Sequence, residues 1–347
     1  MDMRAVAIND FGGVEELQMV EWPVAEPKQG EVGIRVKAVS FNPVEYKLRQ
    51  GRFGGRLPAI LGRDLSGVVE AVGPGVEDLA VGDEVYAYLG GPASNGSYAE
   101  RVSVPIEFVS RKPSNLSFAE AAAVPLVGLT AYESVVVRAR IQEGEAVFVA
   151  GGSGGVGSMA LQLARHLGAD PLITTAGSDR SVSYLVGYLG IPGDRIQRYP
   201  GLSLLELKGR VIDMNGRRPL AAAFDFVGGT MKQLCLELLG FNGRMVTIVE
   251  EPSSFDLNLW NLRQSPTFSR SLTVHFEFLG ARGSSSNRED WGVYRTELGA
   301  LTELIEKGAL RPPQITVMGD FSAETVRSAH LALEQGRVQG KQVMLVN

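Results

Sequence analysis

A run of glycines between residues 151 and 157, with the sequence GGSGGVG, is the stretch of this chain with the clearest chemical meaning. Gly152, Gly154 and Gly157 have the spacing G-x-G-x-x-G. This spacing allows a tight turn, lets the backbone approach a pyrophosphate and lets a following helix pack closely on a sheet. A glycine-rich run in isolation would also suit a flexible linker, so its neighbours must decide between the two.

The residues on either side of these glycines favour a phosphate-binding loop. The apolar segment EAVFVA, residues 145–150, precedes the run, and the helix-forming segment VGSMALQLARHLG, residues 156–168, follows it. The N-terminus of such a helix offers unpaired N–H groups and the positive end of a dipole to a phosphate. We therefore expect a loop that holds the pyrophosphate of a dinucleotide. Its residues are Gly152, Ser153, Gly154, Gly155, Val156 and Gly157.

The segment ITTAGSDRS, residues 173–181, bears on which dinucleotide binds. An NAD site usually has Asp or Glu about 20 residues beyond the glycines, where the carboxylate binds the ribose 2′-hydroxyl. Ala176 occupies roughly this position and leaves room for a 2′-phosphate, to which Ser178 could donate a hydrogen bond and Arg180 a charge-assisted one. The sequence thus favours NADPH. NADH stays open if Asp179 points into the site, although we expect Asp179 to face solvent or to cap the next helix.

From Glu145 onward, strand-like apolar segments alternate with helix-like segments. The expected strands are EAVFVA, PLITTAG, RIQRY, AAAFDFVGG and GRMVTIVE, and the expected helices are VGSMALQLARHLG, SVSYLVGYLG and TMKQLCLELLG. Strands at this spacing with helices between them imply right-handed crossovers and a parallel sheet. The glycine loop would then lie at the carboxyl end of the first of these strands.

The residues before Ser117 have a different pattern. Short runs rich in Val, Ile and Tyr are interrupted by Gly, Pro and Asp at close intervals, which is typical of a compact, barrel-like β domain. Ser117 and Glu120 have the spacing of a capping box and mark the start of helical sequence. We expect a first domain over 1–122, a second over 123–270, and a last segment, 271–347, that forms a sheet edge and returns to the first domain.

Composition and charge argue against several other classes of protein. The 347 residues suit about two domains, and 44% apolar and 21% charged residues are ordinary for a globular chain. The net charge of −5 gives no electrostatic reason to expect a nucleic acid or membrane partner. Cys235 is the only cysteine, and no apolar run reaches the roughly 18 residues of a membrane span. With no signal-peptide pattern, we expect a cytoplasmic protein.

Together these motifs resemble the medium-chain dehydrogenase/reductase superfamily. The similar segments are GRDLSGVVEAVGPGVEDLAVGDEVYA (62–87), AAAVPLVGLTAYESV (121–135) and GGSGGVGSMALQLARHLGA (151–169). The most similar branch is the zinc-free quinone oxidoreductases, the group that includes zeta-crystallin. The resemblance implies an α/β fold, with a GroES-like β-barrel catalytic domain and a Rossmann domain whose doubly wound parallel sheet binds NADPH.

The positions of zinc ligands in that superfamily are the next point of comparison. Zinc alcohol dehydrogenases have a Cys near the position of Asn42 and Gly-His-Glu where this chain has Gly62-Arg63-Asp64. The three histidines, His166, His275 and His330, lie far apart in the chain. A catalytic zinc needs about three protein ligands. We therefore expect no metal site, and we find no Ser–His–Asp set that would indicate a hydrolase.

The resemblance also implies catalytic residues. It places Asn42, Glu45 and Tyr46 near the nicotinamide, with Tyr46 as a hydrogen-bond donor to a substrate oxygen. Asn42 could instead only form a turn before Pro43, and Tyr46 could only pack against the barrel. Arg63 could face the substrate or form an ion pair with Asp64.

Three further positions match cofactor-side residues of that family. Thr130 corresponds to a position beside the nicotinamide. Tyr199 corresponds to a tyrosine near the adenosine end of NADPH, and Lys341 to a basic residue near the cofactor phosphates. Tyr199 could instead be only a tyrosine at the edge of the sheet, and Lys341 only a solvated lysine.

The expected function is an NADPH-dependent, zinc-independent reductase that transfers a hydride to a small, apolar quinone or α,β-unsaturated carbonyl compound. An enoyl reductase that acts on acyl or polyketide thioesters is one alternative, and an NADPH-binding structural or regulatory protein is another. The resemblance also implies a homodimer, formed through strand edges near LTVHFEFL, residues 272–279.

Overall fold

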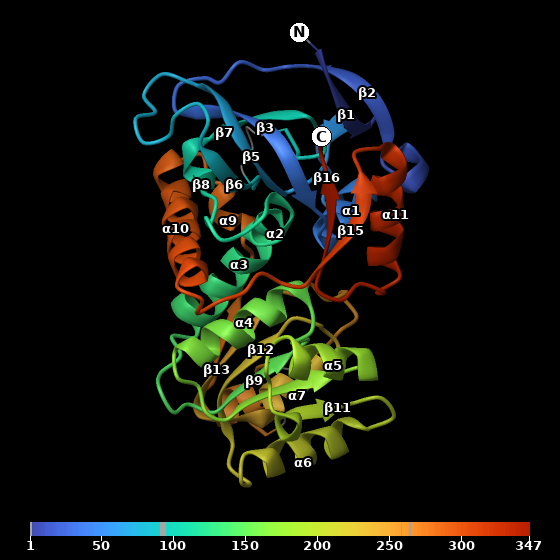
Figure 1. Ribbon diagram of the computed structural model, residues 1–347. Helices are drawn as coiled ribbons and strands as arrows, with labels where there is room; N and C mark the ends of the chain where they lie inside the picture. Colours follow the sequence, from blue (N-terminus) through green and yellow to red (C-terminus); the bar gives the residue numbers. More distant parts are fainter. Residues whose placement is uncertain (1, 91–94, 258, 264) are drawn as a thin grey trace. The chain divides into compact units, whose positions relative to one another are not determined.

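The computed structural model describes residues 2–90, 95–257, 259–263 and 265–347 (Figure 1). The chain divides into two compact units. Unit 1 comprises Met1–Leu129 and Leu279–Asn347, and unit 2 comprises Thr130–Phe278. These boundaries, at 129/130 and 278/279, lie seven and eight residues after the expected changes at 122/123 and 270/271. The expected last segment is therefore divided, because its first residues complete the sheet of unit 2 and the rest belongs to unit 1.

Unit 1 is built on two sheets. The small sheet has the strand order β2-β1-β4, and the seven-stranded sheet has the order β15-β16-β3-β5-β6-β8 with β7 paired to β3. The strands are β1 (Asp2–Ile8), β2 (Gln18–Pro23), β3 (Glu31–Ser40), β4 (Ala59–Ile60), β5 (Asp64–Val72), β6 (Glu84–Tyr88), β7 (Arg101–Pro105), β8 (Val109–Arg111), β15 (Ile315–Asp320) and β16 (Lys341–Leu345). The expected β-rich first domain is confirmed.

The pairing of β3, β5 and β16 brings three distant segments of unit 1 together. Ser40, the last residue of β3, pairs with Asp64 at the start of β5 and with Val343 of β16. A Cβ atom on Gly67 of β5 would lie 2.3 Å from the carbonyl oxygen of Arg35, so glycine allows these two strands to approach closely. Polar residues at the ends of the three strands are thereby gathered in one place.

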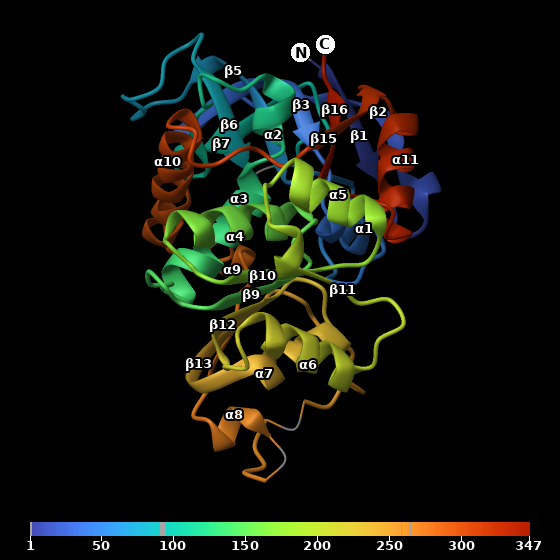
Figure 2. The ribbon, with the colours of Figure 1, turned by 60° about the horizontal axis from the view of Figure 1, so that its bottom comes forward.

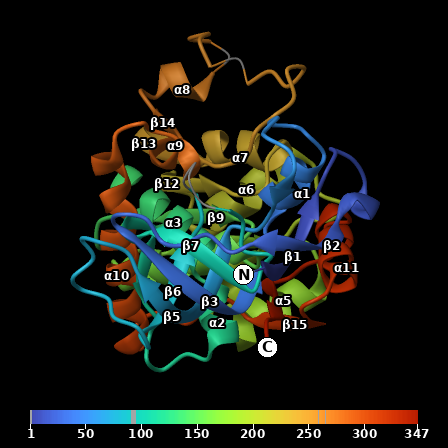
Figure 3. The ribbon, with the colours of Figure 1, turned by 90° about the horizontal axis from the view of Figure 1, so that it is seen from above.

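Helices flank the sheets of unit 1. They are α1 (Pro43–Arg49), α2 (Phe118–Ala122), α9 (Gly280–Gly283), α10 (Gly292–Glu306) and α11 (Ala323–Glu334), with short 3-10 turns η1 (Val14–Glu16), η2 (Ile106–Phe108) and η5 (Arg288–Trp291). Figures 1 and 3 show α10 and α11 on opposite sides of this unit. The Tyr86 hydroxyl donates to the Leu298 carbonyl of α10 at 2.7 Å. The expected capping box is confirmed, because the Ser117 hydroxyl accepts from the Glu120 N–H of α2.

Unit 2 contains the expected parallel sheet, with the strand order β11-β10-β9-β12-β13-β14. The strands are β9 (Val147–Ala150), β10 (Leu172–Ala176), β11 (Ile196–Arg198), β12 (Leu220–Asp225), β13 (Leu239–Thr247) and β14 (Thr273–Phe276). All residues of β9 and β10 are buried, which explains why these strands have continuous apolar sequences. The strands that follow β9 are added first on one side of it, as β10 and β11, and then on the other side, as β12, β13 and β14. This order confirms a doubly wound sheet.

Helices cover both faces of this sheet (Figures 1 and 2). Helices α4 (Gly155–His166) and α5 (Asp179–Gly187) lie on one face, and α6 (Leu204–Met214) and α7 (Thr230–Leu238) lie side by side on the other. The remaining elements are α8 (Pro266–Ser269), the π-helical turn η3 (Glu133–Arg138), the 3-10 turn η4 (Gly193–Arg195) and α3 (Pro125–Tyr132), which contains the boundary between the units.

Apolar side chains of α6 and α7 pack on the sheet of unit 2. Leu207 and Val211 of α6 and Leu234 and Cys235 of α7 are buried in one cluster with strand residues such as Phe148. Although α6 has no counterpart among the expected helices, it begins with a capping box of Ser203 and Glu206. Among the described residues, no helix is long and apolar enough to cross a membrane.

Candidate active site

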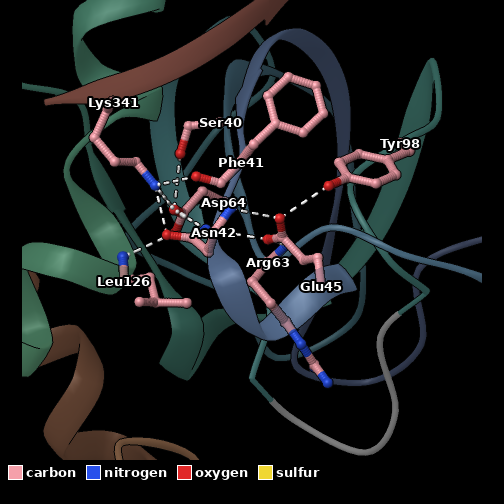
Figure 4. A network of polar contacts seen from close by, with 9 residues as sticks. All are labelled: Ser40, Phe41, Asn42, Glu45, Arg63, Asp64, Tyr98, Leu126 and Lys341. Carbon is pink, nitrogen blue, oxygen red and sulfur yellow. Dashed lines mark hydrogen bonds and ion pairs between the residues drawn. The ribbon is translucent and has the colours of Figure 1, made fainter. Parts of the chain in front are cut away.

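Asn42 lies at the centre of a buried polar network in unit 1 (Figure 4). It follows β3 and is the N-cap of α1, which Pro43 begins. Its amide nitrogen Nδ2 donates to Glu45 Oε1 at 3.0 Å and to Asp64 Oδ2 at 2.8 Å, while its oxygen Oδ1 accepts from the ammonium group of Lys341. Both amide hydrogens are therefore donated to carboxylates. Asn42 can position other groups, but it has no N–H left to donate to a substrate.

Asp64 and Lys341 form the charged part of this network. Asp64 is fully buried and accepts from the Ser40 hydroxyl at 2.8 Å and from the Leu126 N–H at 2.8 Å. Lys341 Nζ lies 2.9 Å from the Phe41 carbonyl oxygen and 3.4 Å from Asp64 Oδ2. Burial lowers the pKa of Lys341, while Asp64 and Glu45 act in the opposite direction.

Glu45 has an unusually complete set of partners for a buried carboxylate. It accepts from the Asn42 N–H at 2.6 Å, the Asn42 side chain, the Arg63 N–H at 3.0 Å and the Tyr98 hydroxyl at 2.9 Å. Three of these donors are nitrogen atoms that cannot accept, so the contacts favour the ionised form. Burial opposes it and raises the pKa of Glu45 to about 7.

Tyr98 and His330 extend the network and are absent from the residues predicted from sequence. The Tyr98 hydroxyl lies 3.1 Å from His330 Nε2, on a residue 232 positions away on α11. Burial raises the pKa of Tyr98 well above its usual value and lowers that of His330 to about 3. The only signal in the sequence is a histidine within the apolar stripe of a helix, which by itself indicates packing.

For two charged residues of unit 1, one of the alternatives left open by the sequence is wrong. Arg63 and Asp64 form no ion pair, because the guanidinium group of Arg63 donates to the Leu89 carbonyl at 2.6 Å and Asp64 is satisfied by other partners. Lys341 is not a solvated lysine, since only 3% of its surface is exposed. Its donors face Phe41, Asn42 and Asp64, so we assign it to this network instead of to the cofactor phosphates.

The predicted phosphate loop in unit 2 has the close packing that its glycines require. A Cβ atom on Gly152 would lie 2.3 Å from Thr174 Oγ1, and one on Gly157 would lie 2.1 Å from the Gly151 carbonyl oxygen. A Cβ atom on Gly154, the N-cap of α4, would have no neighbour closer than 3.4 Å, and Gly154 has no side chain to cap the helix. The first N–H groups of α4, including that of Val156, have no partner within the helix. This cradle fits the pyrophosphate of a dinucleotide.

The ends of β10 and β11 lie where the Rossmann fold would place the adenosine ribose, which carries the 2′-phosphate in NADPH. The Tyr199 hydroxyl is so close to Gly177 that a Cβ atom there would be 2.7 Å away. Ser178 is the N-cap of α5 and accepts from the Ser181 N–H at 3.1 Å. Asp179 faces solvent, as expected, and pairs with Arg198.

Arg198 is a candidate ligand for a 2′-phosphate that sequence reasoning missed. It pairs in register with Ala176, the residue at the position of the expected acidic group. Its side chain is 49% exposed. The signal was present in the sequence as the last basic residue of the strand RIQRY.

The positions of the other predicted residues are reported by unit. Tyr46 lies on α1 and is half-buried, as is Arg63, and both belong to unit 1 with Asn42. Thr130 is buried and is the first residue of unit 2, to which the glycine loop, the exposed Arg180 and Tyr199 also belong. The structure therefore brings the predicted residues together in two sets, one in each unit.

The donor set at the positions of the zinc ligands does not fit a zinc ion. An amide with both hydrogens donated and a guanidinium group replace the Cys and the His, and Asp64 is already bonded to Lys341 and Asn42. Among the residues that the structure describes, no group of three or more His, Cys, Asp or Glu side chains is placed to hold a metal ion. The absence of zinc stays a prediction, tested below.

Comparison with protein families gives one match within unit 1 and one that covers parts of both units. A model described as "Alcohol dehydrogenase GroES-like domain" matches residues 28–114, and one described as "Zinc-binding dehydrogenase" matches residues 208–344. A 2-methylene-furan-3-one reductase from Solanum lycopersicum is 42% identical over 358 residues, covering 99% of this chain and 79% of that protein. The chain belongs to the medium-chain dehydrogenase/reductase superfamily. It is thus an α/β oxidoreductase of the kind that the sequence motifs resemble.

Other medium-chain relatives match as well. An NADPH-dependent alkenal/one oxidoreductase from Arabidopsis thaliana is 41% identical over 189 residues, which cover 52% of this chain and 49% of that protein. The structure of a mycobacterial quinone oxidoreductase is 26% identical, with a TM-score of 0.81 and 99% of each chain covered. A mycobacterial structure complexed with NADPH has the same identity, score and coverage.

Proposed function

We propose that this oxidoreductase uses NADPH to reduce the carbon–carbon double bond of small, apolar α,β-unsaturated carbonyl compounds without a metal ion. The observation that carries the proposal is the closed set of contacts around Lys341. At the positions where zinc relatives have ligands, the side chains of Asn42 and Asp64 are bonded to each other and to the ammonium group of Lys341, and the Arg63 N–H donates to Glu45. Reduction of an enone can proceed without a zinc ion, because a few hydrogen-bond donors stabilise the charge that forms on the carbonyl oxygen.

The cofactor part of the proposal rests on unit 2. When bound, NADPH supplies the hydride that adds to the carbon β to the carbonyl group. The backbone of Gly152–Gly157 would hold its pyrophosphate, and Ser178, Arg180, Arg198 and Tyr199 would surround its 2′-phosphate. Ala176 supports NADPH over NADH because it brings no carboxylate to that position. The similarity to an NADPH-dependent alkenal/one oxidoreductase gives further support.

The catalytic part of the proposal concerns hydrogen-bond donors. Addition at the β-carbon of an enone moves the negative charge through the conjugated system onto the carbonyl oxygen, where a few donors stabilise it. We assign this role to the Tyr46 hydroxyl, with Arg63 and Thr130 as further polar groups on the substrate. Asn42 is assigned a positioning role, because both of its amide hydrogens are already donated. Lys341 supplies the fixed positive charge that holds Asn42 and Asp64.

Quinones are a second candidate substrate class. The observation that favours them is the similarity over 99% of the chain to a mycobacterial quinone oxidoreductase at 26% identity. A quinone is also a conjugated carbonyl compound, so the same donors would stabilise the charge on its oxygen.

The test is a measurement of NADPH consumption with 2-cyclohexenone, 1,2-naphthoquinone and crotonyl-CoA, together with a measurement of NADPH binding. We expect turnover of the enone. Turnover of the quinone alone would show that quinones, not enones, are the substrates, and turnover of crotonyl-CoA alone would show that acyl thioesters are. Tight NADPH binding without turnover of any compound would favour a structural or regulatory protein and contradict the proposed reaction.

A further inference from the structure

Lys232 is a buried cation in unit 2 that the proposed function does not use. It is the third residue of α7, and only 2% of its side chain is exposed. Its Nζ atom lies 2.6 Å from the Val249 carbonyl oxygen, 2.8 Å from Glu251 Oε1 and 3.9 Å from Asp225 Oδ2. A lysine is rarely buried unless its charge is paired, so this arrangement calls for an explanation.

The two carboxylates beside Lys232 hold the backbone of the turn between β12 and α7. Asp225 Oδ1 accepts from the N–H groups of Val227 at 3.1 Å and Gly228 at 2.7 Å, and Glu251 Oε1 accepts from the Gly229 N–H at 2.7 Å. Gly228 and Gly229 have φ angles of 89° and 55°, which are strained for other residues. Three consecutive N–H groups of a turn that needs these glycines are thus bonded to carboxylates that both lie beside the Lys232 ammonium group.

Lys232 and Glu251 also tie this turn to the segment that follows β13. A Cβ atom on Gly228 would lie 2.7 Å from Val249 and 2.9 Å from Glu251, so the two backbone segments are in close contact. Burial acts to raise the pKa of Glu251, but the hydrogen bonds from Lys232 and Gly229 outweigh it and hold the pKa below its usual value. We call Lys232, Glu251 and Asp225 the clamp.

The clamp lies at the same edge of the sheet as the phosphate loop. Asp225, the last residue of β12, pairs with Ala150 of β9 on one side and with Thr247 of β13 on the other. A Cβ atom on Gly151 would be 2.9 Å from Val227, so the glycine loop packs directly on the clamped turn. The 2′-phosphate end of the cofactor belongs to the other side of the loop, after β10. The nicotinamide half must therefore extend from the loop across the ends of β12 and β13.

We infer that Lys232 and Glu251 are positioning residues that hold the turn 225–229 and the segment 248–251 in the shape that accepts the nicotinamide half of the dinucleotide. The inference rests on the proposed use of NADPH. Without the ammonium group, the carboxylates of Glu251 and Asp225 would face each other without a counter-charge, and Glu251 would turn toward water and release both segments. The adenosine half, bound after β10 and β11, would keep its site.

The test compares the dissociation constants of NADPH and of 2′,5′-ADP, which contains only the adenosine half, for the full-length chain and its variants. K232M should weaken NADPH binding by at least about tenfold and change 2′,5′-ADP binding by less than about twofold. E251Q keeps an oxygen that can accept from the Gly229 N–H but removes the negative charge that pairs with Lys232, and it should also weaken NADPH binding more than 2′,5′-ADP binding. Hydrogen exchange of amides 226–229 and 248–251 should become faster in K232M without any ligand.

K208M is the matched control. Lys208 and Glu237 form a Lys–Glu pair of similar length, 2.7 Å, between α6 and the other end of α7 in the same unit. K208M should leave both dissociation constants unchanged. If K232M and E251Q weaken the binding of both ligands equally, or the binding of neither, the inference is wrong while the proposed use of NADPH stands. If the wild-type chain binds neither ligand, the proposed function fails and the inference fails with it.

Discussion

The residues of the network in unit 1 come from distant parts of the chain and meet only in the folded structure. Asn42, Glu45 and Arg63 could be named from sequence because they lie in motifs of a known family. Their hydrogen bonds could not, since these also involve Asp64, Tyr98 and Lys341, which lie far from Asn42 in the sequence. The adjacent residues Arg63 and Asp64 form no ion pair, because the Arg63 guanidinium group donates to the Leu89 carbonyl and Asp64 is bonded to Ser40, Asn42 and Lys341.

Lys341 gives a prediction about buried charge. K341M should lower the free energy of unfolding by about 3–5 kcal/mol, because it leaves the carboxylate of Asp64 buried without its partner. Chemical denaturation measures the change. K307M removes the exposed lysine of the Lys307–Glu303 pair and should cost less than about 1 kcal/mol. Equal effects of the two substitutions would show that the buried network contributes no more than a surface pair.

His330 gives a prediction about pH. Its pKa is lowered by burial to about 3, so between that value and 6.5 the unfolded chain binds the proton more readily and stability is lost as the pH falls. Glu45, whose pKa is raised to about 7, acts in the opposite sense and favours the folded state as the pH falls from about 7 toward 4.5. H330N removes the contribution of His330 and keeps that of Glu45. The free energy of unfolding of the variant should therefore fall less than that of wild type between pH 6.5 and 4.5.

Thermal unfolding at pH values across this range checks the prediction for His330. H166N, a change of an exposed histidine on α4, serves as the control and should follow the wild-type curve. Parallel curves for H330N and wild type would contradict the assignment of acid sensitivity to His330.

At the scale of elements, the sequence predicts unit 2 better than it predicts unit 1. Strands β9 and β10 are buried on both faces, so they have uninterrupted apolar sequences that are easy to recognise. Helix α6 carries a capping box and an apolar face but lies in a polar stretch, and it was missed. Helix α1 has only seven residues and has no counterpart among the expected helices, although Pro43 and Glu45 are typical of a helix start.

The glycine loop gives the prediction at this scale. G157A places a methyl group 2.1 Å from the Gly151 carbonyl oxygen, so α4 must move away from the loop. We expect NADPH binding to weaken by about tenfold or more. G209A adds a methyl group in open space on α6 and should raise the free energy of unfolding by about 0.5–1 kcal/mol without changing the dissociation constant. A G157A variant that binds NADPH as wild type does would contradict the loop's role.

At the scale of the whole molecule, the exposed strand β14 supports the proposed homodimer. It is the outer strand of the sheet of unit 2. Phe276 at its end is 69% exposed, and Phe278, two residues beyond the strand, is 66% exposed. Exposed aromatic residues on an unpaired strand edge favour association with another chain. We expect F276D to be a monomer by light scattering when wild type is a dimer. L205D, on the exposed face of α6, should stay dimeric. A monomeric wild-type chain would contradict the proposal.

The central claim is that this medium-chain oxidoreductase reduces enones with NADPH and without zinc. The most direct test is kcat/KM for 2-cyclohexenone with NADPH, measured before and after dialysis against a zinc chelator, with the zinc content of each sample determined. We predict the same value in both samples, less than one zinc per ten chains, and a value at least about tenfold lower with NADH. Loss of activity together with one zinc per chain, restored by added zinc, would contradict the claim.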